Sequence, residues 1–447
     1  MKKLFHKKGS LILKEKPFAC VLQSRYRAER CDKCFKPGKV LKCSNCLYVR
    51  YCNRFCQKEA WPDHQDECAK LKAIGTTRTV PDAALMMARI IRKLQKGGDF
   101  QKGYYTAKYY RRFYDLMTHE DDIKKDPQRM EHFQSLLVVL QSLVEEAAMP
   151  SNVELLQIYG KMCINSFNIL DDEMNSIGTG MYIGTSIIDH SCRPNALATF
   201  DGSTIHVRLL EDYHGSEVDF SKIFISYIDL MNTTEERKTR LRTQYYFECN
   251  CERCRDEQEL WLMNAGACPN VDCDEPIPML DRKVDKCPRC DTAIKHSARE
   301  EYREVTDFTL AQLAKMKDIT YMDICQLCLK KHENILHYYN VWYLKVLDLA
   351  FESAINMQKW EDAIGYGLRL KDGFRKYNGS FHPLYGLLLL KIGKIQLLTK
   401  HIVEALQNIN DSEKILRVTH GEEHDLYKSQ LIPLLCQAAG EYDMLNK

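Results

Sequence analysis

The chain has 447 residues, with 64 Lys and Arg against 61 Asp and Glu and a formal net charge of +3. This near balance argues against a protein built mainly to bind DNA or an anionic membrane. The length allows two or three domains, each with its own core. The N-terminal apolar run at residues 11–13 is too short for a signal peptide, and no stretch approaches a membrane span.

Twenty cysteines are unusual for a chain of this composition. Without a leader sequence they indicate metal ligation in a reducing compartment rather than disulfides. Most of them fall into groups with zinc-like spacing, and Cys20, Cys163, Cys325, Cys328 and Cys436 stand outside these groups. We therefore expect a protein of the cytoplasm, the nucleus or both.

Two short apolar runs within residues 9–25 flank a turn-like Lys-Glu-Lys-Pro and predict a strand pair. Residues 31–68 then carry four closely spaced pairs of zinc-ligand residues, enough for two closed sites. The eight residues are Cys31, Cys34, Cys43, Cys46, Cys52, Cys56, His64 and Cys68. A segment this short has little core of its own, so metal binding must supply most of its folding free energy.

Residues 69–177 predict a helical block. Pro81 opens a first helix that Gly97 and Gly98 close, a second ends at Pro150, and a third spans about residues 153–165. Short β-like runs follow at residues 196–200, 204–210 and 222–227. Cys192, before these runs, could join the C-x-C-x2-C array of Cys249, Cys251 and Cys254 in a closed tetrahedral zinc site.

The remainder contains one further cysteine group and a helical region. A zinc ribbon at residues 258–300 is predicted from the ligands Cys268, Cys273, Cys287 and Cys290. Residues 301–447 predict helices with a weak 42-residue repeat that aligns His382-x2-Tyr385 with His424-x2-Tyr427, typical of stacked helix pairs. Cys325 and Cys328 lie in a helical run and are interpreted as packed thiols.

Several of these motifs together resemble the SET-and-MYND (SMYD) family of protein-lysine methyltransferases. They are His190-Ser191-Cys192-x-Pro194-Asn195, a later Ile-Ser-Tyr227, a Tyr245-x-Phe247-x-Cys249 segment and the finger at 31–68. The resemblance implies an α+β multidomain fold. Its SET domain would comprise residues 1–30 and 178–230, split by the finger and the helical insertion, and followed by a post-SET zinc segment at 231–257 and a TPR-like C-terminal domain.

The resemblance also implies roles for single residues. Tyr227 would be the catalytic tyrosine and Tyr245 would line the lysine channel. S-adenosylmethionine (AdoMet) would be bound by Asn165, Ser186, Asp189, His190, Tyr227 and Phe247. In the finger, Cys31, Cys34, Cys52 and Cys56 would hold one zinc ion, and Cys43, Cys46, His64 and Cys68 the other. The segment ending at Cys192 would be threaded by the chain bearing Tyr227.

Three departures from the family pattern affect the cofactor side. A glycine-rich turn expected before the first strand is absent, since Gly9 is the first glycine. Asp189 stands where the family has Asn, and a carboxylate cannot donate a hydrogen bond as an amide does. Several extra residues, around 218–222, precede Tyr227.

Two hypotheses follow. One is an AdoMet-dependent lysine methyltransferase that acts on histone tails or cytosolic proteins, with transcriptional regulation as an expected role. The other is a catalytically weak scaffold that recruits partners. In both, the finger would bind proline-rich peptides and the TPR-like groove a chaperone C-terminal tail. We expect a monomer without membrane association, and DNA binding would not be its main activity.

Overall fold

The computed structural model describes residues 5–75, 78–215, 217–281, 283–316 and 321–445. The chain forms two compact units. The first comprises the residues up to His190 with Pro194–Ile225 and Arg242–Phe247, and the second comprises Ser191–Arg193, Ser226–Leu241 and the residues from Glu248 onward. The first unit contains the strands and the second is built mainly of helices, which confirms the predicted α+β class with a helical C-terminal region.

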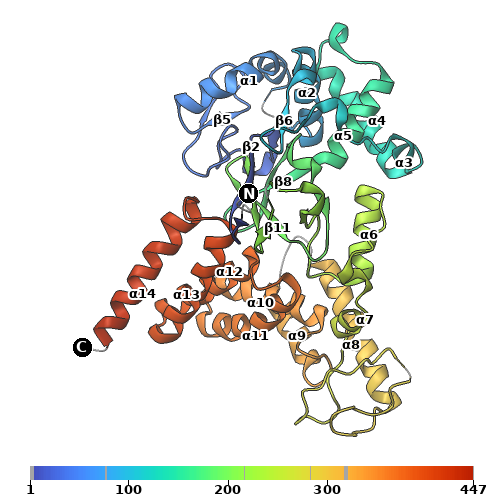
Figure 1. The fold of residues 1–447 in the computed structure, drawn as a ribbon, viewed down its shortest axis with the longest axis vertical. Helices are drawn as coiled ribbons and strands as arrows, with labels where there is room; N and C mark the ends of the chain where they lie inside the picture. Colours follow the sequence, from blue (N-terminus) through green and yellow to red (C-terminus); the bar gives the residue numbers. More distant parts are fainter. Residues whose placement is uncertain (1–4, 76–77, 216, 282, 317–320, 446–447) are drawn as a thin grey trace. The chain divides into compact units, whose positions relative to one another are not determined.

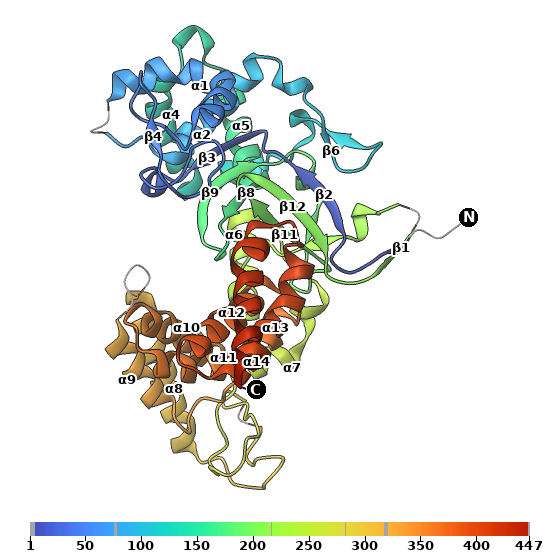
Figure 2. The same ribbon diagram turned by 90° about the vertical axis from the view of Figure 1, so that its left-hand side faces the viewer.

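Two three-stranded sheets form the β core of the first unit (Figure 2). One has the order β11 (Ala196–Asp201), β12 (Thr204–Leu209), β2 (Leu11–Glu15), and the other the order β3 (Ala19–Leu22), β9 (Ser176–Met181), β8 (Ser166–Leu170). The two N-terminal runs are therefore strands, but the prediction that they pair is wrong. Each finds a partner in a different sheet, with antiparallel ladders to β12 and β9.

The predicted helices of the first unit are present, although the second ends at Leu143 instead of the predicted Pro150. They are α2 (Asp82–Gln95), α4 (Pro127–Leu143) and α5 (Asn152–Asn165). Local signals fix their starts, since Asp126 caps α4 and Ser151 forms a capping box with Glu154 at the start of α5. The buried face of α2 includes Leu85 and Ile90, each 0% exposed.

The helical block is less continuous than predicted. Residues 103–111 form a hairpin of β6 (Gly103–Tyr104) and β7 (Tyr110–Arg111), and the segment from Ser166 is strand rather than helix. Phe167 and Ile169, two residues apart in β8, both pack into one core cluster with Ile177 of β9, as alternate residues of a strand do. The helical region thus ends at Asn165, twelve residues before the predicted limit at 177.

A short parallel pair joins distant parts of the chain. β10 (Asp189–His190) pairs with β14 (Phe224–Ile225), and Asp189 faces Phe224 in the register. Parallel strands require a crossover rather than a hairpin, and here β11 and β12 form that crossover. The pairing places the His190 strand beside the segment that leads to Tyr227.

The second unit is mostly a stack of helices (Figure 1). They are α8 (His296–Lys315), α9 (Met322–His332), α10 (Val341–Asn356), α11 (Trp360–Asn378), α12 (Pro383–Leu398), α13 (Ile402–Thr419) and α14 (Ile432–Leu445). The 42-residue repeat has a structural basis. His382 Nδ1 accepts from Leu384 N at 3.3 Å, and His424 Nδ1 accepts from Leu426 N at 3.2 Å.

Candidate active site and metal centres

Two groups of ligand atoms lie in the finger, with the donors of each group within 4.8 Å of one another. The groups are Cys31, Cys34, Cys52 and Cys56, and Cys43, Cys46, His64 and Cys68, the same interleaved sets that the resemblance implied. Helix α1 (Arg54–Ile74), which Asn53 caps, supplies the last ligand of one set and two of the other. Cysteine and histidine donors at this spacing fit Zn²⁺.

A buried carboxylate orients the histidine of the second group. Glu67, 1% exposed, contacts His64 Nδ1 at 3.0 Å, which leaves Nε2 facing Cys46 Sγ at 3.6 Å. The guanidinium of Arg89 donates to both oxygens of Glu67 at 2.7 and 2.9 Å. Burial raises the pKa of Glu67, but the charges and hydrogen bonds of Arg89 and His64 together lower it to about 2. Such an outer carboxylate fixes the tautomer of a metal-binding histidine.

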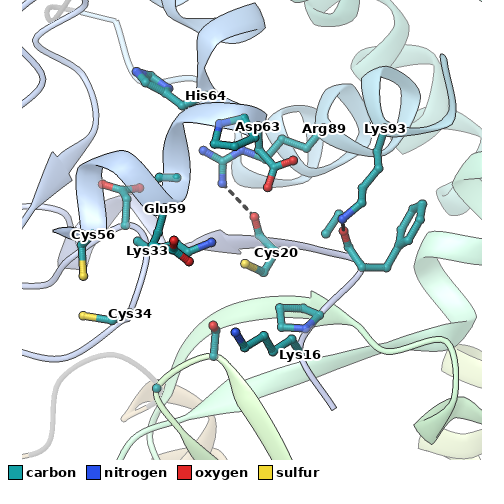
Figure 3. Close-up of a pocket in the computed structure, with 18 of the residues that line it drawn as sticks. Lys16, Cys20, Lys33, Cys34, Cys56, Glu59, Asp63, His64, Arg89 and Lys93 are labelled. Carbon is teal, nitrogen blue, oxygen red and sulfur yellow. Dashed lines mark hydrogen bonds between the residues drawn. The ribbon is translucent and has the colours of Figure 1, made fainter. Parts of the chain in front are cut away.

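A cleft of about 860 Å³ lies between the finger and the β core of the first unit. Figure 3 shows Cys20 in it, with the side chains of Lys33, Asp63 and Lys93 around it. Burial raises the pKa of the Cys20 thiol, so this side chain is a neutral lining group rather than a nucleophile. The lining contains both basic and acidic side chains, so the cleft does not carry charge of one sign.

The predicted post-SET ligands also converge, in the second unit. Cys192, Cys249, Cys251 and Cys254 form one group, and the Sγ atoms of Cys192 and Cys254 lie 3.6 Å apart. Arg237, 0% exposed, places its guanidinium 4.0 Å from Cys254 Sγ, and Arg253, 3% exposed, donates to the carbonyl of Cys192 at 3.2 Å. The buried guanidinium of Arg237 offsets part of the excess negative charge that four thiolates leave around one divalent ion.

A fourth group occurs where the zinc ribbon was predicted. Cys268, Cys273, Cys287 and Cys290 bring their donors together, with Sγ–Sγ distances of 3.6 Å for Cys268–Cys290 and 3.8 Å for Cys273–Cys287. Arg299 from α8 donates to carbonyls of this loop and attaches it to the helical unit. Among the described residues, the candidate metal groups do not include Cys325 and Cys328, which are buried in the helical core as predicted.

Apart from Tyr227, the residues expected to bind AdoMet fall on several elements of the first unit. The rings of His190 and Phe247 lie 6.0 Å apart at 55°. Asn165 is buried, and its amide donates to the carbonyls of Met117 and Lys161, each at 2.9 Å. Ser186 Oγ donates to the carbonyl of Ile183. The half-buried aromatic ring of Phe247 beside His190 suits an adenine ring.

The exposed Asp189 lines a different surface. It shares a hollow of about 500 Å³ with Tyr105, Tyr109, Phe220 and Asp219. The hollow is formed partly by the extra residues that precede Tyr227, so this insertion shapes the surface next to the His190 strand. Its aromatic and acidic lining favours a cation over an anion.

The two tyrosines fall in different parts of the chain. Tyr227 follows β14 by two residues and belongs to the second unit, where it is half-buried. Tyr245 ends α6 (Thr234–Tyr245) and belongs to the first unit. Burial raises the pKa of Tyr245, against the opposing effect of Arg129, so its hydroxyl stays protonated and can donate a hydrogen bond.

Sequence reasoning missed the contribution of the β6–β7 hairpin. Its last residue, Arg111, donates to Ser186 Oγ at 3.2 Å and to the carbonyl of Asp115 at 2.9 Å. The segment that follows supplies the carbonyl of Met117, which holds Asn165. A dense run of tyrosines from Tyr104 to Tyr110 was the available signal, because such residues favour strands over helices.

Comparison with known proteins agrees with this arrangement. Residues 31–68 match the MYND finger family. The chain is 30% identical over 434 residues to the histone-lysine N-methyltransferase SMYD3 of Mus musculus, covering 95% of this chain and 92% of the relative. It is 27% identical over 425 residues to the N-lysine methyltransferase SMYD2 of Homo sapiens, covering 93% and 90%. The chain is a member of the SMYD family, whose name refers to its SET and MYND domains.

No helix within the described ranges is long and apolar enough to cross a membrane.

Proposed function

We propose that this protein is an AdoMet-dependent protein-lysine N-methyltransferase. The observation that carries the proposal is the similarity to lysine methyltransferases over more than nine-tenths of the chain. The parallel pairing of the His190 strand with the strand before Tyr227 supports it, as does the ring of Phe247 next to His190. Histone tails and cytosolic proteins remain the substrate classes that the resemblance implies.

In this proposal AdoMet, when bound, supplies the methyl group that the lysine amine attacks. Phe247 and His190 would hold the adenine of AdoMet. Ser186 and Asn165 would lie beside the rest of the cofactor. The hydroxyls of Tyr227 and Tyr245 would orient the amine, because a direct displacement needs a near-linear approach and no covalent intermediate. An apolar channel would lower the pKa of the substrate lysine and favour its neutral, nucleophilic form.

We further propose zinc in all four cysteine groups. The post-SET group would fix Cys192 next to His190 in sequence and so hold the cofactor strand in place. The two sites of the finger would maintain a short segment that has little core of its own. The finger would serve for recruitment of protein partners, with proline-rich peptides as the expected ligands and the nucleus and cytoplasm as the expected compartments.

Calorimetric titration with S-adenosylhomocysteine tests the proposal first. Micromolar binding by zinc-replete protein, followed by methyl transfer to a histone or a cytosolic protein, is the expected result. Tyr227→Phe should abolish transfer and leave cofactor binding intact, and Tyr321→Phe, an exposed tyrosine at the start of α9, is the matched control. Absence of cofactor binding in folded, zinc-replete protein would refute the enzymatic function.

A second candidate is a scaffold without methyl transfer. The amide of Asn165, expected to contact the cofactor, is committed to two backbone carbonyls. Asp189 adds a carboxylate where an amide was expected. The scaffold hypothesis predicts that Tyr227→Phe changes no function of the protein, whereas substitutions in the finger abolish recruitment of partners.

A further inference from the structure

Arg111 lies next to a residue that the proposed function places at the cofactor. Its guanidinium donates to Ser186 Oγ at 3.2 Å, and that hydroxyl in turn donates to the carbonyl of Ile183 at 2.9 Å. A second donor of Arg111 reaches the carbonyl of Asp115 at 2.9 Å. The contacts on both sides hold the half-buried guanidinium at the beginning of the segment that ends in His190.

The methionine part of AdoMet has a carboxylate and an ammonium group. A carboxylate needs a cation or several N–H donors when it leaves water, and the fork of a guanidinium matches its two oxygens. Asp189, three residues after Ser186, cannot serve this purpose because its carboxylate repels another. Arg111 therefore provides the positive charge that this carboxylate needs, next to Ser186.

We propose that Arg111 binds the carboxylate of AdoMet and thereby determines specificity for a cofactor with an intact amino-acid head group. The inference rests on the proposed function, since it assumes that AdoMet binds beside Ser186. The side chain would reach the carboxylate from the end of the β6–β7 hairpin. Its fixed position between Ser186 and Asp115 would reduce the entropy lost on binding.

Calorimetry with AdoMet and with decarboxylated AdoMet tests the inference directly. We expect the wild-type protein to bind AdoMet about ten- to one hundred-fold more tightly than the decarboxylated compound. Arg111→Met should lower the affinity for AdoMet by a similar factor. It should leave the affinity for the decarboxylated compound unchanged or higher, because a positive charge has been removed from beside a cationic ligand. Arg112→Met is the matched control, since this neighbour lies over Tyr110 instead.

The outcomes separate this inference from the proposed function. If the wild-type protein binds AdoMet and Arg111→Met keeps the same preference for AdoMet over the decarboxylated compound, the role of Arg111 alone is overturned. If Arg111→Met loses affinity equally for AdoMet and for the decarboxylated compound, the role is also overturned, because equal losses would indicate a structural role for Arg111. Failure of the wild-type protein to bind AdoMet would overturn both. If Arg111→Met does not fold, Arg111→Lys keeps the charge without the fork and should retain part of the preference; full retention would contradict a bidentate contact.

Discussion

Replacement of Arg253 by methionine should destabilise the second unit strongly. Arg253 is 3% exposed, and its guanidinium donates to the carbonyls of Cys192 and Leu230 at 3.2 and 3.1 Å and forms a salt bridge with Glu259. It therefore joins the post-SET cysteine group, the segment after Tyr227 and α7 (Glu257–Met263). Methionine has a similar apolar length but neither the charge nor the donors.

The magnitude follows from what the substitution leaves behind. Removal of one partner from a buried ion pair costs about 3–5 kcal/mol, because the other charge stays buried. A buried carbonyl that loses its donor adds about 1–3 kcal/mol. Arg193 lies 3.9 Å from Glu259 and offsets part of its charge, but the side chain of Arg193 is 51% exposed and the compensation is weak. We expect a loss of about 3 kcal/mol or more in the free energy of unfolding.

Urea unfolding followed by circular dichroism measures this loss, and zinc content is determined on the same samples. Arg255→Met is the matched control, because Arg255 belongs to the same short helix, Glu252–Arg255, and is exposed. The control should lose less than about 0.5 kcal/mol. Equal losses in the two variants, or a loss below about 1 kcal/mol for Arg253→Met, would refute the reasoning. Addition of Glu259→Met to Arg253→Met should recover part of the stability, because it removes the uncompensated charge.

Two further predictions concern the second unit. Cys268→Ser should reduce the zinc content by one ion from the four that the cysteine groups can hold, as measured by native mass spectrometry, and an unchanged count would contradict a metal role for the ribbon. Asp348 has a pKa raised to about 7 by burial and by the carboxylates of Glu352 and Asp229, against the opposing charge of Lys391. Because the folded state favours its neutral form, stability falls as the pH rises toward 7, by at most about 1.4 kcal/mol per pH unit. Asp348→Asn should therefore melt at a higher temperature than the wild-type protein. The difference in melting temperature should grow from pH 5 to pH 7 and stay constant above pH 7. Equal differences at pH 5 and pH 8 would exclude this explanation.

Features that depend on local spacing could be predicted from the sequence. The spacing of Cys and His indicated the ligand residues of the four metal groups, because closely spaced ligand pairs are typical of zinc sites. The division of the finger ligands into two interleaved sets came from the family resemblance. The start of α2 followed from Pro81, and α5 begins within one residue of the predicted position, because helix starts depend on local signals that act on the nearest backbone donors. The helical C-terminal region followed from apolar periodicity over long segments.

Tertiary structure decided which strands meet and what surrounds the candidate site. The partners of β2 and β3 could not be inferred, because a strand of four or five residues has no pairing preference that outweighs the sheet it joins. The contact of Arg111 with Ser186 links residues 75 positions apart, and that of Arg253 with Cys192 links residues 61 apart. Such contacts have no signature in local sequence, because they depend on loop closure and on the burial of charge by the complete fold.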